Sequence, residues 1–369
     1  MKPVCPRFLL AGLAIASLAL AQPQPRPQPP LMTCGMHGGV DIYCGTRSPE
    51  DLELTPDNKY LIVSQFVSGG AAKGAGLSLF DISKGTFSPI SISAHQRKDW
   101  GDPACPGPVG DKLSPHGISL SKRANGTMQL YVVNHGGRES IEMYELKPAR
   151  GSWDLVWHGC VVSAKDFNDV AAMPDGGFAA THPTSLRAKG DNSNLFSGQP
   201  SGWVVRWTAG KGEVELPGTR TGYPNGVLVA SDNRTVYFNA WTAKEVHRYD
   251  LQTQKETGVV KLDFMPDNIT WTQRHQVLAA GVKGVRGDCP PGSKEPCMQG
   301  FGVAEIAASR TGPLKAQTVF DSHGKGAMIS GVSVALQAGN ALYIGAFQGN
   351  RIVKIGSDAY QARLLPIGK

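Results

Sequence analysis

The sequence predicts an all-β protein, and three observations support this prediction. The 369 residues include 45 glycines and 26 prolines, and no stretch shows a long helical periodicity. Short runs of alternating apolar residues recur instead, as is typical of half-buried strands. These runs are separated by Pro-Asp, Asn-Gly, Asp-Gly and Gly-Asn pairs, which favour tight turns.

Six units of similar design follow one another, and each opens with a polar residue at the start of a short apolar strand. In the third unit, Asn168 and Asp169 precede an apolar strand, a Pro-Asp-Gly-Gly turn and a second strand that ends near His182. The units open, in order, at Glu50, His116, Asn168, Asn225, Asp267 and Ser330. Successive openings are 42 to 66 residues apart, which leaves room for about four strands in each unit.

This repeat predicts a six-bladed β-propeller with a central metal-binding channel. A propeller blade is a four-stranded sheet, and the inner strands of all blades line the channel. The polar residues that open the inner strands would then converge at one end of it. A pair of β-sandwiches is the alternative, but it does not explain why a polar residue opens every inner strand.

The N-terminus carries the pattern of a cleavable signal peptide. Lys2 and Arg7 precede an apolar run, which is too short for a membrane anchor and ends at Ala19-Leu20-Ala21. We therefore expect a secreted or periplasmic protein without a membrane span. The predicted organisation is a signal peptide at 1–21, a Pro/Gln-rich leader at 22–33 and the six-bladed β-propeller at 34–369.

Removal of the signal peptide would leave six of the seven cysteines, an even number that suggests disulfides in an exported protein. Six cysteines allow fifteen pairings, and no CxxC pair points to a zinc-thiolate site. Bonds between cysteines close in sequence are favoured for Cys34–Cys44 and Cys289–Cys297, and Cys105 and Cys160 would then pair with each other. The expected bonds are Cys34–Cys44, Cys289–Cys297 and Cys105–Cys160.

The formal net charge of +7 comes from scattered basic residues rather than from a basic block. Loss of Lys2 and Arg7 would lower it to about +5. This distribution is typical of a solvated surface and does not indicate nucleic-acid binding. The sequence does not indicate protein partners.

The residues that open the inner strands form an oxygen-rich set without thiolates. Carboxylate and amide oxygens suit Ca²⁺ better than Zn²⁺. Asp51 and Asp169 come one residue later and would point away from the first ion, where they could hold a second, buried one. Any one such residue more often caps a turn, so the prediction depends on the recurrence. The candidate set at the channel mouth is Glu50, His116, Asn168, Asn225, Asp267 and Asn268, with Ser330 as a further candidate.

The ordered motifs resemble the paraoxonase/arylesterase family of six-bladed propeller lactonases, within the wider gluconolactonase-like and strictosidine-synthase-like superfamily. The resemblance covers residues 48–355, nearly the whole predicted mature chain. The motifs that carry it are Ser-Pro-Glu50-Asp51-Leu-Glu-Leu, Pro115-His116-Gly-Ile-Ser, Leu-Tyr-Val-Val-Asn134-His135, Asn168-Asp169-Val-Ala, Asn225-Gly and Asp267-Asn268-Ile.

The resemblance implies two calcium ions. Glu50, Asn168, Asn225, Asp267 and Asn268 would bind the catalytic ion. Asp51, Asp169 and the carbonyl of Ile118 would bind the structural one. His116 and His135 match the family's histidine dyad, whereas His182 has no matched role and is expected to be structural.

The expected function is hydrolysis of a small-molecule lactone or carboxylic (aryl) ester by a calcium-dependent lactonase or arylesterase. Calcium would polarise the carbonyl, and water would attack with His116 as base and His135 passing the proton outward. Glu50 or Asp267 is an alternative base. Two alternative functions are a gluconolactonase-like sugar lactonase and a non-catalytic, calcium-stabilised binding propeller.

Two features depart from the family pattern. The family's paraoxonases join the first and last strands by a disulfide. This chain has no cysteine after Cys297, so its ring closure must depend on strand pairing alone. The loop between Gly284 and Phe301 looks like an insertion over the channel mouth. Four aromatic residues could line the substrate pocket there or belong to the blade cores, namely Phe66, Trp241, Trp271 and Phe347.

Overall fold

The computed structural model describes residues 31–67, 76–183, 199–284, 300–323, 325 and 327–359. These residues contain 26 strands and one 3₁₀ turn, η1 (Gly110–Lys112). The predicted signal peptide, most of the leader and the Cys289–Cys297 pair lie outside the described residues. No helix in the described ranges is long and apolar enough to cross a membrane.

The strands form six sheets, which confirms the predicted all-β, six-bladed propeller. The first blade contains β3 (Pro49–Leu54), β4 (Tyr60–Gln65), β5 (Gly76–Asp81) and β6 (Thr86–Pro89). The second contains β8 (Pro115–Lys122), β9 (Met128–Asn134), β10 (Ser140–Ala149), β11 (Ser152–Val162) and β7 (Ser91–Ala94). The third contains β12 (Val170–Ala172), β13 (Phe178–His182), β14 (Trp203–Thr208) and β15 (Gly212–Glu215).

The remaining blades follow the same order from the channel outward. The fourth contains β16 (Pro224–Val229), β17 (Thr235–Ala240), β18 (Glu245–Asp250) and β19 (Lys255–Lys261). The fifth contains β20 (Met265–Trp271), β21 (Val277–Val282), β22 (Phe301–Ile306) and β23 (Ala316–Asp321). The sixth contains β24 (Val332–Ala338), β25 (Ala341–Ala346) and β26 (Arg351–Ile355), together with β2 (Val40–Cys44) and β1 (Gly35–Met36).

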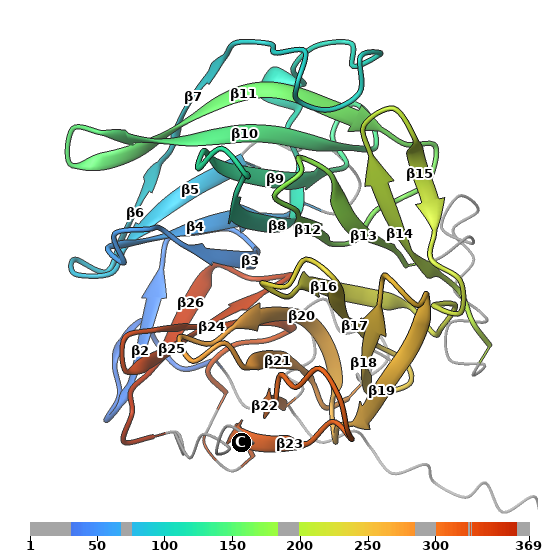
Figure 1. The fold of residues 1–369 in the computed structure, drawn as a ribbon. Coiled ribbons are helices and arrows are strands. Elements are labelled where there is room, and N and C mark those ends of the chain that lie inside the picture. The colour runs from blue at the N-terminus through green and yellow to red at the C-terminus, as the bar shows by residue number, and fades with distance from the viewer. Residues whose placement is uncertain are drawn as a thin grey trace, which may run out of the picture.

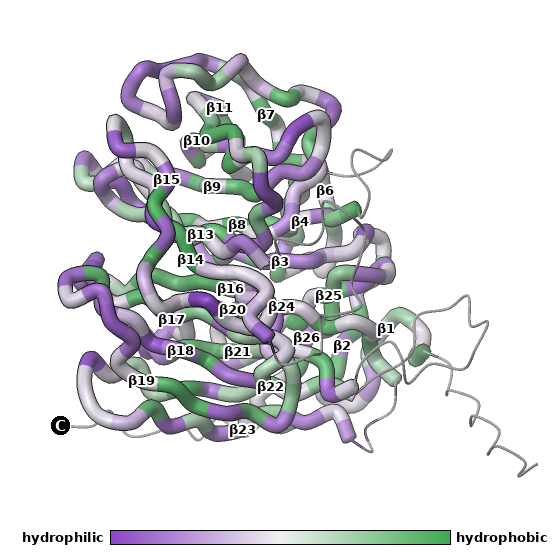
Figure 2. The backbone as a smooth tube through the Cα atoms, turned by 90° about the vertical axis from the view of Figure 1, so that its right-hand side faces the viewer, coloured by the Kyte–Doolittle hydropathy of each residue, from purple (hydrophilic) through white to green (hydrophobic). Residues whose placement is uncertain are grey.

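The blades follow one another around a ring, and the inner strands β3, β8, β12, β16, β20 and β24 meet near its centre (Figure 1). Figure 2 shows hydrophobic stretches along strands within the blades and hydrophilic stretches in many of the loops at the periphery. Each of the six hydrophobic clusters lies between two consecutive blades. Between the second and third blades, for example, the Tyr131 ring meets the edge of Phe178 at 6.3 Å between centroids. Burial on both faces of each sheet therefore holds the ring together.

The ring is closed by strand pairing, because β2 near the N-terminus pairs antiparallel with β26 near the C-terminus. Lys354 adds an ion pair to Asp41 at 3.3 Å across this seam. The disulfides Cys34–Cys44 and Cys105–Cys160 are both present as predicted. Neither joins the first and last strands, so closure does not depend on a covalent bond.

A β-bulge recurs at the start of five of the six inner strands. The register shifts within Pro49–Asp51, Pro115–Ile118, Pro224–Val227, Pro266–Ile269 and Val332–Val334. A bulge adds a residue to one strand and redirects its side chains. Four of the five bulges contain the polar residues that were predicted to face the channel.

Candidate active site and metal centre

The bulges bring the predicted mouth residues together. Asn268 Nδ2 donates hydrogen bonds to Glu50 Oε1 at 2.7 Å and to the Glu50 carbonyl at 3.1 Å. His116 Nε2 lies 3.6 Å from the same Glu50 Oε1. Asn268 belongs to the fifth blade and Glu50 to the first, so this contact links two blades that are separated in the ring by the sixth. That blade contributes the small Ser333, whose hydroxyl donates to the Glu50 carbonyl at 2.6 Å.

The neighbouring blades complete the cluster. The Asn168 carbonyl accepts the backbone N–H of Gly117 at 3.2 Å, and the Asn225 carbonyl accepts the Thr181 hydroxyl at 2.6 Å. Asp267 adjoins Asn268 in the β20 bulge and is only 7% exposed. Close backbone approach here requires glycine at 226, where a Cβ would lie 2.7 Å from the Asp267 carbonyl oxygen. All five predicted ligands of the catalytic ion are therefore buried at the channel mouth.

Four side-chain oxygens of this cluster are buried without a hydrogen-bond partner among the described residues. They are Glu50 Oε2, Asn168 Oδ1, Asn225 Oδ1 and Asn268 Oδ1. A buried polar atom without a partner is costly, so each needs an explanation. A hard divalent cation explains all four, because carboxylate and amide oxygens are the ligands of Ca²⁺. The residues present therefore fit a calcium ion at this site.

The donor set differs from the usual transition-metal cluster. Within the described ranges, no three His, Cys, Asp or Glu side chains are grouped so that they could hold a metal ion. The amide oxygens therefore have to supply part of the coordination. This composition favours a hard ion of flexible geometry over zinc.

The carboxylates of the channel have strongly perturbed acidities. Burial holds the pKa of Glu50 well above its usual range, and repulsion from Asp51 and Asp267 adds to this effect. Burial likewise raises the pKa of Asp51 to about 7, and it raises the pKa of Asp169 well above its usual range, with Asp51 again contributing. A bound cation would offset this cost, since it favours the ionised carboxylates.

The residues predicted for the second ion lie deeper in the channel. Asp51, Asp169 and Ile118 line one cavity of about 300 Å³ formed by all six inner strands. Asp51 accepts the backbone N–H groups of Ile118 at 2.7 Å and Leu52 at 2.8 Å. The Asp169 carboxylate also accepts two backbone N–H groups, one from the next residue, Val170, and one from Val227 in β16. Each carboxylate oxygen keeps one further lone pair, and the second ion stays a prediction.

The two histidines of the predicted dyad are hydrogen-bonded to each other. His116 Nδ1 lies 2.9 Å from His135 Nε2. His135 Nδ1 in turn lies 2.7 Å from Glu139 Oε2. Phe66 stacks on the His116 ring at 4.4 Å and meets His135 edge-on at 6.0 Å. A line of contacts therefore runs from buried Glu50 through both imidazoles to partly exposed Glu139.

Three of the four predicted wall aromatics lie at the mouth. Phe66, Trp241 and Phe347 each follow the second strand of a blade and donate their backbone N–H to the segment at the start of its inner strand. His135 occupies the same position in the second blade. The Phe347 ring is half-exposed and is therefore available to a ligand.

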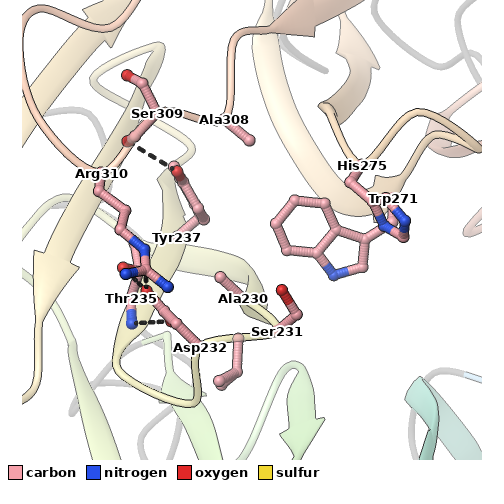
Figure 3. A pocket seen from close by; sticks show the side chains of 11 residues that line it. Ala230, Ser231, Asp232, Thr235, Tyr237, Trp271, His275, Ala308, Ser309 and Arg310 are labelled. Carbon is pink, nitrogen blue, oxygen red and sulfur yellow. Dashed lines mark hydrogen bonds and ion pairs between the residues drawn. The ribbon is translucent and has the colours of Figure 1, made fainter. Parts of the chain in front are cut away.

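Trp271 does not join the other three aromatics. It is the last residue of β20, three positions beyond Asn268, and an extended strand advances about 3.3 Å per residue. Its ring meets Tyr237 edge-on at 5.9 Å and lines a crevice of about 320 Å³ between the fourth and fifth blades (Figure 3). Trp271 also lines the cavity inside the channel, so it lies toward the end of β20 away from Asn268 and apart from the other three aromatics.

His182 has the structural environment that was expected for it. Its Nδ1 contacts the Asp166 carbonyl at 2.8 Å, and its Nε2 contacts Glu213 Oε1 at 2.8 Å. Sequence reasoning missed Glu139, which follows His135 by four residues, and the bulges that turn the ligands inward. The glycine pair between the two residues is the signal that a tight loop could return Glu139 to His135.

Comparison with known proteins shows the family of this chain. A family model described as "SMP-30/Gluconolactonase/LRE-like region" matches residues 71–286, which is more than half of the chain. The chain belongs to this family. The predicted resemblance to propeller lactonases is therefore confirmed.

Two relatives and the solved structure of another protein are similar to this SMP-30/gluconolactonase-like chain. Human "Serum paraoxonase/lactonase 3" is 25% identical over 240 residues, covering 60% of this chain and 63% of the relative. Mouse "Serum paraoxonase/arylesterase 1" is 26% identical over 255 residues, covering 65% and 66%. The chain thus spans somewhat less than two thirds of these relatives. A luciferin-regenerating enzyme shares the fold with a TM-score of 0.51 at 12% identity, covering 87% of this chain and 97% of that one.

Proposed function

We propose that the protein is a calcium-dependent hydrolase of lactones or carboxylic esters. The observation that carries this proposal is the convergence of four unpartnered oxygens beside a hydrogen-bonded histidine pair. A set of open oxygen ligands next to a base is what metal-assisted hydrolysis needs. The related lactonase and arylesterase named above support the same class of reaction.

The chain's own residues would have separate roles. Glu50, Asn168, Asn225, Asp267 and Asn268 would hold the catalytic ion, and Asp51, Asp169 and the Ile118 carbonyl a structural one. A calcium ion bound at the mouth would polarise the substrate carbonyl and stabilise the oxyanion that develops there. His116 would take a proton from the attacking water, and His135 would accept the proton that leaves His116 Nδ1.

The mouth favours a substrate with an apolar portion. Phe66 covers the dyad, and Phe347 presents an exposed ring beside the start of β24. Aromatic walls with few fixed polar groups suit an acyl chain or an aryl group. The two disulfides support an exported protein, secreted or periplasmic, as the N-terminal residues predict.

Hydrolysis assays with and without a chelator test this proposal. Phenyl acetate, γ- and δ-lactones and a sugar lactone should be compared, and we expect turnover that a chelator abolishes and added calcium restores. Asn225→Ala and Asn268→Ala should each reduce activity and calcium affinity together. Unchanged turnover in both variants contradicts the metal mechanism. Calcium binding without turnover of any ester or lactone would instead favour a binding propeller.

A further inference from the structure

The structure assigns a positioning role to Glu139. We propose that its carboxylate fixes the tautomers of both imidazoles, so that His116 presents an unprotonated Nε2 toward Glu50 and the channel mouth. This inference rests on the proposed function, because it concerns the base of that reaction. Glu139 would then act with the two histidines as a third residue, and it would accept the proton that leaves His135.

The tautomers follow from the distances. An ionised carboxylate can only accept, so the 2.7 Å contact between Glu139 Oε2 and His135 Nδ1 requires a proton on Nδ1. A neutral His135 then has an unprotonated Nε2. The 2.9 Å contact from that nitrogen to His116 Nδ1 requires that His116 donate. His116 Nε2, 3.6 Å from Glu50 Oε1, is therefore the unprotonated atom that faces the mouth.

The loop that carries His135 and Glu139 is held rigidly by Asn134. This buried amide accepts the backbone N–H groups of Ser114 and Gly136, and it donates to the carbonyls of Gly136 and Arg138. Gly136 is required here, because a Cβ would overlap a backbone carbonyl oxygen at 1.6 Å. The geometry of the relay is therefore built into the blade rather than left to a mobile surface side chain.

The neighbouring cation does not compete for Glu139. The Arg138 guanidinium turns toward Glu142, with contacts of 2.8 and 3.1 Å, and also donates to the Gly107 carbonyl at 2.6 Å. The Glu139 backbone carbonyl accepts the Ser163 N–H at 3.0 Å, which anchors the residue to the end of β11. The Glu139 carboxylate therefore binds His135 without competition from Arg138.

The line of contacts also gives the proton a route to solvent. When His116 Nε2 takes a proton from water, its Nδ1 proton can pass to His135 Nε2, and the His135 Nδ1 proton can pass to Glu139. Exposure of the side chains increases along this route, from 6% at His116 to 11% at His135 and 26% at Glu139. The first transfer breaks an O–H bond of water, whose oxygen attacks the carbonyl, and forms the N–H bond on His116 Nε2. The second breaks the His116 Nδ1–H bond and forms one on His135 Nε2. The third breaks the His135 Nδ1–H bond and forms an O–H bond on Glu139, so charge and atoms balance at every step.

The blade that follows contains a matched control. His182 Nε2 contacts Glu213 Oε1 at 2.8 Å, and the Glu213 side chain is 25% exposed. This pair has the same chemistry as His135 and Glu139 and a similarly exposed carboxylate, although the His182 side chain is fully buried, and it does not contact the dyad. Glu213→Ala should therefore reproduce the general effect of removing such a carboxylate without affecting His116.

Nitrogen NMR of ¹⁵N-histidine-labelled protein tests the tautomers directly. In the wild type we expect His135 to carry its proton on Nδ1 and His116 to have an unprotonated Nε2. Glu139→Ala should release His135 toward the Nε2–H form, which free neutral imidazoles favour, and shift the His116 signals as well. Glu139→Gln keeps an acceptor oxygen and should retain the wild-type tautomers.

Steady-state kinetics with the best lactone or ester substrate give the second readout. We expect Glu139→Ala to lower kcat about tenfold to a hundredfold with KM within twofold, since groups that orient a catalytic side chain contribute about this much. Glu139→Gln should fall between wild type and Glu139→Ala, and Glu213→Ala should match wild type.

Wild-type tautomers in Glu139→Ala would overturn the inference. So would an unchanged kcat in that variant, or an equal loss in Glu213→Ala. If the wild type hydrolyses no ester or lactone, the proposed function fails, whereas the NMR spectra still decide whether Glu139 sets the tautomers.

Discussion

Chelation should make the stability of this protein fall as the pH rises. Burial raises the pKa of Asp51 to about 7, so without a cation the folded protein keeps a proton there that the unfolded chain releases near pH 4. A folded-state pKa above the unfolded value favours folding at low pH. That contribution is lost between the two pKa values as the pH increases.

The magnitude follows from the same pKa value. Each extra proton on the folded state changes the free energy of unfolding by about 1.4 kcal/mol per pH unit. Asp51 alone should therefore lower the free energy of unfolding by about 3 kcal/mol as the pH rises from 5 to its pKa of about 7. Glu53, whose pKa burial raises to about 8, should extend the loss to higher pH.

Urea unfolding of chelated and calcium-loaded protein at pH 5, 6, 7 and 8 measures this effect. We expect a falling free energy of unfolding for the chelated protein and a flatter profile with calcium, which replaces the proton. Asp51→Asn should reduce the slope by about one proton. Asp250→Asn is the matched control, because the pKa of Asp250 lies below its usual range and the group stays ionised throughout. A chelated profile that is flat or rises from pH 5 to 7 would refute the reasoning.

Two substitutions give further tests. Gly117→Ala would place a Cβ 2.3 Å from Asp169 Oδ1 and 2.6 Å from its Cα, so we expect about 2 kcal/mol or more of destabilisation in chemical unfolding and weaker calcium binding by calorimetry. Gly356→Ala, whose nearest contact is at 3.5 Å, should show neither effect. Phe347→Ser should raise KM for long-chain or aryl substrates several-fold, since about 1–2 kcal/mol of apolar contact is lost. Trp271→Ala should leave KM unchanged. If Trp271→Ala raised KM and Phe347→Ser did not, the substrate pocket would lie at the other end of the channel.

The repeat was sufficient to predict the fold and to place the candidate ligands at the starts of inner strands. Glu50, Asn168, Asn225 and Asn268 are each unremarkable alone, but their spacing placed them at the starts of the inner strands of four different blades. The structure brings them together because consecutive inner strands line one channel. A period of this kind is a long-range signal that survives even where each local propensity is weak.

Two parts of the site could not be predicted in the same way. The sequence offered Trp271 either as a pocket wall or as part of a blade core, because an aromatic residue near an inner strand does not show which end of that strand it occupies. The strand direction, fixed by tertiary pairing, puts it at the far end. Glu139 lies in a loop, where a contact depends on local backbone geometry rather than on a periodic pattern.

Anomalous diffraction from crystals of the calcium-loaded protein tests the central claim most directly. We expect a calcium peak at the channel mouth, within coordination distance of Glu50 Oε2 and the amide oxygens of Asn168, Asn225 and Asn268. Those are the buried oxygens that lack a partner in the described part of the chain. A map without a peak among these four oxygens, at a calcium concentration that saturates activity, would contradict the account.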